Sequence, residues 1–414
     1  MKKFFKAYAD FPLILKILAG LIIGVVLGLF VPQAAFVTVF GDLFVGALKA
    51  IAPILVFVLI IASLASAGKG IGKRFSTVIF FYMISTLLAA AMAVVISFIF
   101  KVNIPLSGVE EASNTAPSGL AEVFKTLLNN IVVNPITAMQ SGNYLSILTW
   151  AIVFGIALRT FAAENTKTVL SDISGAVSKA IAWIIQLAPF GVMGLIYGSI
   201  GEYGMKLFID YGKLVAVLVG CMLLVSLVIN PFIVFLTLKK NPYPLLFKCL
   251  KESGITAFFT RSSAANIPVN MSLCEKLGLE REYYSVAIPL GATINMDGAA
   301  ITITVMSLAA AFTMGIEVNI FSAIILSFIA TLGACGASGV AGGSLLLIPM
   351  ACSLLGVDQA IAMQVVGVGF IIGVIQDSVE TALNSSGDVY FAAVAEYRDR
   401  MKKGESIPFF EKKK

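Results

Sequence analysis

The chain has 414 residues, of which 59% are hydrophobic and only 13% are charged. Its mean hydropathy of +0.97 is far above that of a protein whose surface faces water. Apolar runs of about 20 residues recur along the whole chain, which excludes an ordinary soluble domain and predicts one body of membrane-embedded helices. The net charge of +6 is modest, and the lysines gather at the ends of apolar segments. This distribution disfavours nucleic-acid binding.

The chain contains five cysteines and no histidine. The cysteines lack metal-ligand spacing and most lie among apolar residues, so we expect buried free thiols. Without imidazole, the commonest proton relay at neutral pH and the commonest transition-metal ligand are both missing. Proton coupling through histidine is therefore excluded.

Six ordinary membrane spans are predicted in the first 240 residues, at 11–31, 44–67, 76–100, 144–161, 182–200 and 214–238. The first span follows three lysines as a signal peptide would, but it is long and lacks a convincing cleavage site, so we expect a retained helix. Basic residues gather after an even number of crossings, which places those loops and both termini in the cytoplasm. The segment 159–179 is expected to be another cytoplasmic connection.

Beyond residue 240 the apolar stretches become short or are interrupted by polar residues. Irregular backbone at membrane depth needs to be buried by protein or to line a cavity, because lipid offers no hydrogen bonds. Interruptions of this kind indicate a transporter's binding site. We predict a Ser-rich hairpin tip at 260–268, a helix at 284–314 broken at 295–298, a Gly-rich tip at 333–343 between arms 320–332 and 345–355, and a long helix at 360–394. The order of these elements indicates an inverted repeat.

The last predicted helix carries a polar stripe. Its members follow the i, i+4, i+7, i+11 spacing of one helical face: Asp377, Thr381, Asn384 and Asp388. A carboxylate at membrane depth costs about 3 kcal/mol unless a cation or hydrogen-bond donors compensate it. Since Arg261 is nearly alone as a base at this depth, we expect metal ions and a substrate ammonium as the cations.

The candidate ion ligands are all hard oxygens, which favour sodium. They are the carboxylates of Asp297 and Asp388, the Asn295 amide, the hydroxyls of Ser85, Thr86 and Thr293, and carbonyls freed at helix breaks. Broken helices also present N-termini to an anion and C-termini to a cation. A zwitterionic amino acid together with sodium would suit such a site.

Each motif also has a structural interpretation. A small-residue turn in a membrane protein is often a packing interface, Asp377 could be a structural partner of Arg261, and Tyr82 could be a packing residue. The Asn-Met-Asp-Gly break has few structural uses and favours function.

An ion channel could use polar hairpin tips too, although two hairpins between broken helices favour an occluding gate. An enzyme is disfavoured because no histidine accompanies the carboxylates.

These motifs resemble the dicarboxylate/amino acid:cation symporter family over essentially the whole chain. The resemblance rests on Thr-Arg-Ser-Ser at 260–263, Gly-Ala-Thr-Ile-Asn-Met-Asp-Gly at 291–298, the Gly-rich tip and the end of the polar stripe. It implies an all-α membrane protein of the glutamate-transporter type, with eight transmembrane helices, two re-entrant helical hairpins and inverted repeats. It also implies a homotrimer in the inner (plasma) membrane.

The resemblance further implies a scaffold and a moving transport domain. The scaffold would comprise helices 1 and 2 (1–70) and helices 4 and 5 with an external loop (102–210). The transport domain would comprise helix 3 (71–101), helix 6 (211–240) and a core of two hairpins and the last two helices (241–400), before a cytoplasmic tail (401–414). The transport domain would slide past the scaffold like an elevator.

The same resemblance implies the roles of individual residues. Asp377 would hold the substrate amino group with Thr381, and Asn384 would bind the substrate carboxylate beside Ser262 and Ser263. The other substrate-site candidates are Ala299, Glu380 and Gly339. Asn295 and Asp388 would share one sodium ion, and Asp297 would hold another with Ser85 and Thr86. A third sodium site would use Thr293, Met296 and carbonyls of the second hairpin.

Two positions depart from the family members that carry acidic substrates. At position 380 this chain has glutamate where those members share an arginine, and at position 299 it has alanine where they have threonine. A substrate with a second carboxylate would be repelled by Glu380 in a poorly hydrated pocket. The expected activity is therefore sodium-coupled import of small neutral amino acids such as serine and threonine. Arg261 could pair with Glu380; if it faced the substrate, a sodium- or proton-coupled dicarboxylate or acidic amino acid symporter would be the alternative.

Overall fold

The computed structural model of the chain describes residues 12–66, 73–106, 132–204, 206–337, 342–407 and 409–410. Regular structure within these ranges is helical, without a strand. Six helical segments of the described chain are long and apolar enough to cross a membrane: Ala35–Ala62, Arg74–Ile99, Glu164–Ile185, Lys206–Leu238, Arg281–Thr313 and Gln359–Lys402. The predicted helical membrane protein is confirmed at this level.

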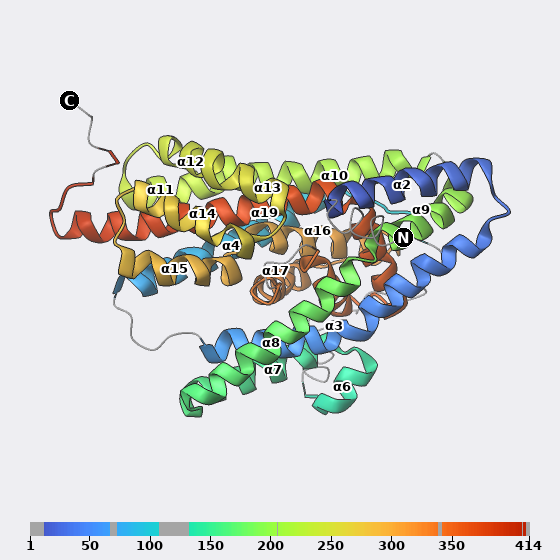
Figure 1. The fold of residues 1–414 in the computed structure, drawn as a ribbon, viewed down its shortest axis with the longest axis horizontal. Helices are drawn as coiled ribbons and strands as arrows, with labels where there is room; N and C mark the ends of the chain where they lie inside the picture. The colour runs from blue at the N-terminus through green and yellow to red at the C-terminus, as the bar shows by residue number, and fades with distance from the viewer. Residues whose placement is uncertain are drawn as a thin grey trace, which may run out of the picture.

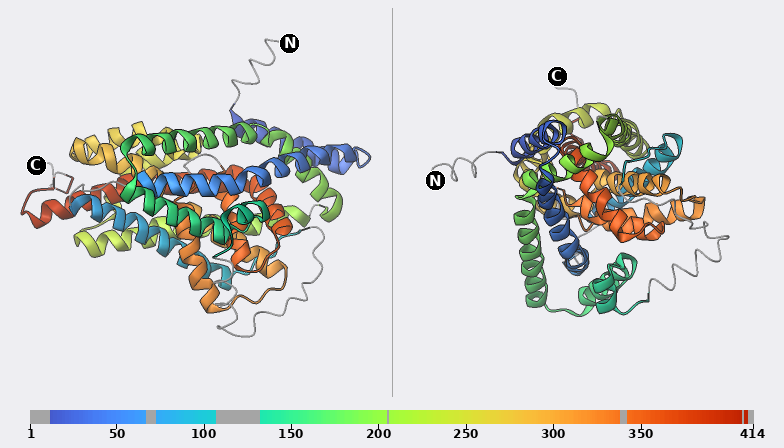
Figure 2. Two further views of the ribbon diagram at one scale, coloured as in Figure 1. Left: turned by 90° about the horizontal axis from the view of Figure 1, so that it is seen from below. Right: turned by 90° about the vertical axis from the view of Figure 1, so that its right-hand side faces the viewer.

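Seven elements of the first half of the chain pack together. They are α2 (Leu13–Phe30), η1 (Ala35–Val37), α3 (Thr38–Ser66), α6 (Pro135–Ser141), α7 (Tyr144–Phe161), α8 (Glu164–Ile185) and α9 (Ala188–Tyr203). Helix α3 contacts α7, α8 and α9, and α2 lies against α9. The approach of α2 to α9 requires Gly20, because a Cβ there would stand 2.1 Å from the Pro189 carbonyl oxygen. Helices α3, α7 and α8 lie along one side of the molecule (Figures 1 and 2).

Two predictions about this half are wrong. Helix α8 covers most of the segment 159–179, which we expected to be a simple connection, and the predicted span 182–200 is interrupted at Gln186 and Leu187. Pro189 lies in the first turn of α9, where proline can begin a helix but cannot continue one. The polar residues of α8 suggested a loop, yet they alternate with apolar residues along a single helix, of which Ile181 and Ile185 are buried.

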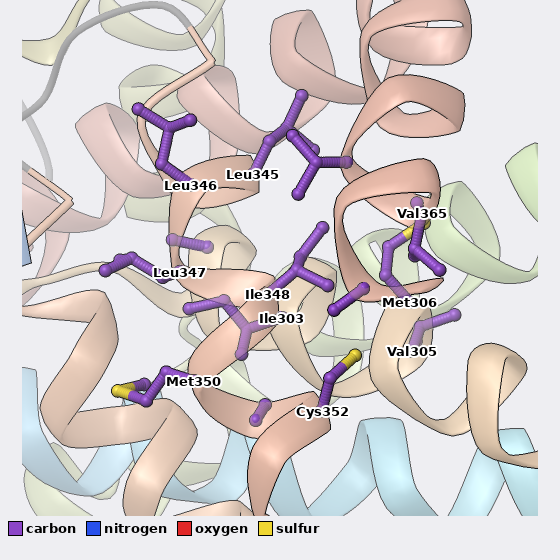
Figure 3. Close-up of a cluster of buried hydrophobic side chains, with 14 of the residues drawn as sticks. Ile303, Val305, Met306, Leu345, Leu346, Leu347, Ile348, Met350, Cys352 and Val365 are labelled. Carbon is purple, nitrogen blue, oxygen red and sulfur yellow. The ribbon is translucent and has the colours of Figure 1, made fainter. Parts of the chain in front are cut away.

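The other elements of the described chain form a second group. They are α4 (Lys73–Ile99), α10 (Lys206–Leu224), η2 (Val225–Ile229), α11 (Asn230–Leu238), α12 (Tyr243–Cys249), η3 (Leu250–Gly254), α13 (Ile255–Thr260), α14 (Ser263–Lys276), α15 (Arg281–Ile294), α16 (Asp297–Thr313), α17 (Ile320–Ala334), η4 (Ser344–Leu347), α18 (Ile348–Leu354) and α19 (Gln359–Lys402). Residues 297–311 of α16 are all buried. Ile303 and Met306 of α16 pack among Leu345, Ile348 and Val365, which come from η4, α18 and α19 (Figure 3). A helix that is buried on all sides forms the centre of a core.

The predicted interruptions of helical structure near residue 261 and at 295–296 are confirmed. Arg261 adopts a left-handed conformation with φ of 52° and ends α13, and Ser262 caps α14 by accepting a hydrogen bond from the Ala265 amide at 3.2 Å. Helix α15 ends at Ile294 and α16 begins at Asp297, so two residues of irregular backbone separate them. Both breaks expose backbone groups beside α19, against which α13, α14, α15 and α16 all pack.

Ion pairs fasten the start of α4 to the end of α19. The Arg74 guanidinium lies 2.6 Å from both Glu280 and Asp399, and Lys403 lies 2.9 Å from Asp399. The hydrogen bond from Arg74 lowers the pKa of Glu280, which lies just before α15. These contacts join α4, α15 and α19 at one end of the core.

Candidate functional site

The polar stripe of α19 is buried rather than exposed to solvent. Asp377 is 2% exposed and Asp388 is fully buried. Thr381 and Asn384, which lie between them on the stripe, are buried as well. Helix α19 packs here against α13, α14, α15 and α16. A stripe of this kind within the core needs polar partners from the neighbouring elements.

Asp297 begins α16 and is held by neutral groups from two other helices. The hydroxyls of Ser85 and Thr86, on α4, each lie 3.0 Å from Asp297 Oδ1. The Asn230 amide donates to Asp297 Oδ2 at 2.8 Å. Asp297 itself is fully buried. The predicted grouping of Ser85, Thr86 and Asp297 is therefore present in the structure.

Asp388 lies next to this group and is joined to it through Asn295. The Asn295 amide donates to Asp388 Oδ1 at 3.0 Å, and Asn295 Oδ1 lies 3.4 Å from the Ser85 hydroxyl. Asp388 Oδ2 is buried and has no hydrogen-bond partner among the described residues. Tyr82, which we considered a packing residue, donates its hydroxyl to the Asp388 carbonyl at 2.9 Å.

Neither of these carboxylates has a basic partner in the described ranges, where every ion pair involves other acids. Neutral donors compensate a buried negative charge only in part, so a charged Asp297 or Asp388 would attract a cation. The surrounding ligands are carboxylate, amide and hydroxyl oxygens. This donor set fits an alkali cation.

Asn384 and Met296 connect the helix break to α19. The Gly298 amide donates to Asn384 Oδ1 at 2.7 Å, and Asn384 Nδ2 lies 3.4 Å from the Met296 thioether. A thioether is a weak acceptor, so Asn384 Nδ2 keeps capacity for a stronger one. The Met296 amide lies 3.3 Å from the Thr86 hydroxyl, which brings Met296 to the ion-ligand candidates as well.

Arg261 pairs with Asp377, at 2.7 Å from Nε to Oδ2. The suggested pairing of Arg261 with Glu380 is therefore wrong. The structure instead contains the Arg261–Asp377 pair that we considered as a structural alternative. Asp377 and Glu380 are about one helical turn apart, and Arg261, in a left-handed conformation between α13 and α14, reaches the former. Thr381 donates to the Asp377 carbonyl at 2.7 Å within α19.

Glu380 is held by three neutral donors, and all of them reach the same carboxylate oxygen. Thr302 of α16 donates to Oε2 at 2.7 Å, Ser344 of η4 donates at 2.9 Å, and Gln376 of α19 donates from Nε2. These donors stabilise a negative charge beside Asp377. With Arg261, the group carries two acids and one base.

The other predicted residues are placed as follows. Thr293 donates to the Leu290 carbonyl of its own helix at 2.7 Å. Ala299 and Ser263 are buried, and the Ser262 hydroxyl caps α14. Gly339 lies outside the described residues.

Several site residues were not identified from the sequence: Asn230, Thr302, Ser344 and Gln376. Asn230 had a local signal, since Asn-Pro interrupts an otherwise apolar span. The other three had no such signal, because membrane helices often contain neutral polar residues of this kind: Thr302, Ser344 and Gln376. Only the folded contact with Glu380 distinguishes them.

Gly298→Ala is expected to lower the melting temperature by about 5 °C. A Cβ at Gly298 would stand 2.8 Å from Glu380 Cα and 2.9 Å from its carbonyl oxygen, so α16 would have to move away from α19. Thermal unfolding of the purified protein measures the effect. Gly373→Ala on α19 is the control, because a Cβ there meets no atom within 4 Å. Equal melting temperatures for both variants would contradict the close packing at Gly298.

The sequence model of the sodium:dicarboxylate symporter family matches residues 13–397. The match includes every residue of the site described above. The chain belongs to the sodium:dicarboxylate symporter family. It is therefore a multi-pass membrane transporter and not an enzyme, and the resemblance that we inferred from the sequence motifs is confirmed.

Individual members of the sodium:dicarboxylate symporter family are similar to this chain over nearly its whole length. The serine/threonine transporter SstT of Bifidobacterium adolescentis is 57% identical, over 97% of this chain and 94% of that protein. The transporter of the same name from Streptococcus agalactiae is 55% identical, over 96% of this chain and 98% of that protein. The one from Streptococcus thermophilus is 53% identical, over 97% of this chain and 100% of that protein.

Proposed function

We propose that this chain is a sodium-coupled symporter that imports small neutral amino acids, with serine and threonine as its main substrates. The observation that carries the proposal is the pair of buried acids, Asp297 and Asp388, which are joined through Asn295 and have only neutral partners among the described residues. Such carboxylates need cations from outside the chain. The family name adds sodium, and the relatives' names add serine and threonine.

Sodium ions are proposed to bind at three places. Asn295 and Asp388 would hold one ion, for which the unpartnered Asp388 Oδ2 is a ready ligand. Asp297 would hold a second with the hydroxyl oxygens of Ser85 and Thr86. The third site would use Thr293, Met296 and carbonyls of the second hairpin. The Thr293 hydroxyl donates within its own helix, which leaves its oxygen lone pairs available to an ion.

The substrate is proposed to bind between the first hairpin and α19. Asp377 would accept the substrate ammonium with help from Thr381, while Asn384 Nδ2 would donate to the substrate carboxylate beside Ser262 and Ser263. The ammonium would join a site that carries two acids and only one base, where a positive group is favoured. Ala299 and Gly339 would line the remainder of the pocket.

Glu380 is proposed to select against acidic substrates. Its carboxylate accepts hydrogen bonds from Thr302, Ser344 and Gln376, and a charged Glu380 would place a negative charge in the pocket. A second substrate carboxylate would be desolvated next to this charge. The alternative is a dicarboxylate or acidic amino acid symporter, which the charge of Arg261 at the same place favours.

The architecture is proposed to be that of a trimeric elevator. Eight transmembrane helices and the hairpins α13–α14 and α17–α18 would divide into a scaffold (1–70 and 102–210) and a transport domain (71–101, 211–240 and 241–400), with a tail at 401–414. The packing of α3 with α7, α8 and α9, and of α4 with α16 and α19, supports this division. We propose the inner membrane as its location, with both termini in the cytoplasm.

Purified protein in proteoliposomes is expected to accumulate labelled serine only with an inward sodium gradient. Replacement of external sodium by potassium is the control, and equal uptake in both buffers would contradict sodium coupling. Unlabelled threonine is expected to compete for uptake, whereas aspartate and succinate are not. Competition by aspartate or succinate at the level of threonine would favour the dicarboxylate alternative.

A further inference from the structure

The membrane-spanning segment that contains Asn230 is distorted just before this residue. A single π-helical turn, Val225–Ile229, separates α10 from α11, and Pro231 follows Asn230. π-Helical turns within α-helices are frequent at functional sites. Pro231 has no N–H to bond the Leu227 carbonyl, and the Tyr243 hydroxyl donates to that carbonyl at 3.2 Å instead. The distortion is therefore compensated by a residue of another helix.

The side chain of Asn230 points into the protein from this turn. Asn230 is 2% exposed, whereas Val228 and Phe232 on either side are 49% and 58% exposed. Its Nδ2 lies 2.8 Å from Asp297 Oδ2, and its Oδ1 is buried without a partner among the described residues. A buried amide with one unsatisfied atom costs free energy that leucine would avoid. The contact with Asp297 is the one hydrogen bond in the described structure that accounts for asparagine here.

The two oxygens of Asp297 have partners of different chemistry. Oδ1 faces the hydroxyls of Ser85 and Thr86, which can rotate to donate to the carboxylate or to present lone pairs to a cation. Oδ2 faces an amide NH₂, which can only donate. The amide therefore fixes one oxygen without supplying a positive charge, while the other oxygen stays available.

We propose that Asn230 positions Asp297 for sodium binding, by holding Oδ2 so that Oδ1 and the hydroxyls of Ser85 and Thr86 face the ion. The inference rests on the proposed function, since it assigns a role at the proposed Asp297 sodium site. A neutral donor suits a site whose ion must enter and leave, because a lysine or arginine at this position would replace the sodium permanently.

The test uses Asn230→Leu in the full-length protein, with sodium titrated against thermal unfolding in the absence of amino acid. The variant is expected to raise the sodium concentration for half-maximal stabilisation about tenfold, as loss of a hydrogen bond to a charged group would. Its melting temperature without sodium is expected to stay within about 3 °C of the parent, because an unsatisfied amide atom is removed as well. Asn230→Ala, which cannot overpack the site, is expected to give the same rise.

A positioning role also predicts a change in ion discrimination. For each ion, the midpoint is the concentration that gives half-maximal stabilisation. The ratio of the lithium midpoint to the sodium midpoint is expected to move toward one in both variants, since discrimination between ions depends on fixed ligand geometry. Thr237→Val on α11 is the matched control, because the Thr237 hydroxyl donates only to the Ile233 carbonyl of its own helix. This control is expected to leave the sodium midpoint and the ion ratio unchanged.

The outcomes separate this inference from the function on which it rests. Sodium midpoints within twofold of the parent in both Asn230 variants would overturn the positioning role, and the sodium site would stand. A lower melting temperature without sodium, combined with an unchanged midpoint, would also overturn it, because that result describes a purely structural residue. A parent protein that sodium stabilises no more than potassium does would instead remove the proposed function itself.

Discussion

Asp377→Asn is expected to weaken serine binding at least about a hundredfold, even at saturating sodium. The substitution keeps the shape of the side chain but removes the charge that the substrate ammonium would meet. It also removes the ion-pair partner of the Arg261 guanidinium, which lies 2.7 Å from Asp377 and is 8% exposed. Both effects act against a substrate ammonium at this place. Equilibrium binding of labelled serine to the purified variant measures the loss.

Asp399→Asn is the matched control for this experiment. Asp399 lies on the same helix, but it pairs with Arg74 and Lys403 at the far end of the core. The control is expected to bind serine as the parent does. If Asp377→Asn lowered the melting temperature yet bound serine with the parent affinity, Asp377 would be only a structural partner of Arg261.

Asp297→Asn is expected to abolish the stabilisation by sodium and to reduce sodium-driven serine uptake at least about a hundredfold. The carboxylate is the charge that would hold the ion, and its partners are all neutral. The fold should survive, because an asparagine at 297 can accept from Asn230 and donate to the hydroxyls of Ser85 and Thr86. Thermal unfolding with and without sodium measures the first effect.

The melting temperature of this variant without sodium decides between two explanations. The sodium-site account predicts a value equal to or above that of the parent, because a buried charge has been removed. A large fall in that value, with the response to sodium retained, would show that Asp297 stabilises the fold and does not bind the ion.

The breaks that position the site could be predicted because each places polar or glycine residues inside an apolar stretch. Asn295 and Asp297 cannot continue a lipid-facing helix without partners, so the sequence alone indicates an interruption there. The grouping of Ser85, Thr86 and Asp297 followed from the family resemblance, and the hydroxyl contacts at 3.0 Å agree with it. Helix α8 was missed because its polar residues are of the kind that is typical of loops.

The partners of the acids could not be predicted, since they depend on contacts between distant segments. Arg261 is 116 residues from Asp377, and the backbone conformation between α13 and α14 decides whether it reaches this acid or Glu380. Ser344 reaches Glu380 from η4, whose other residues are leucines. Asn230, which directly follows a π-helical turn, is 67 residues from Asp297 in the chain.

The central claim is that buried acids of this core bind sodium and an amino acid together. Equilibrium binding of labelled serine to the purified protein, measured across about a hundredfold range of sodium at constant ionic strength, tests it most directly. The account predicts that serine affinity rises with sodium and that serine raises the affinity for sodium by the same factor. A serine affinity that is equal in sodium and in potassium would contradict it.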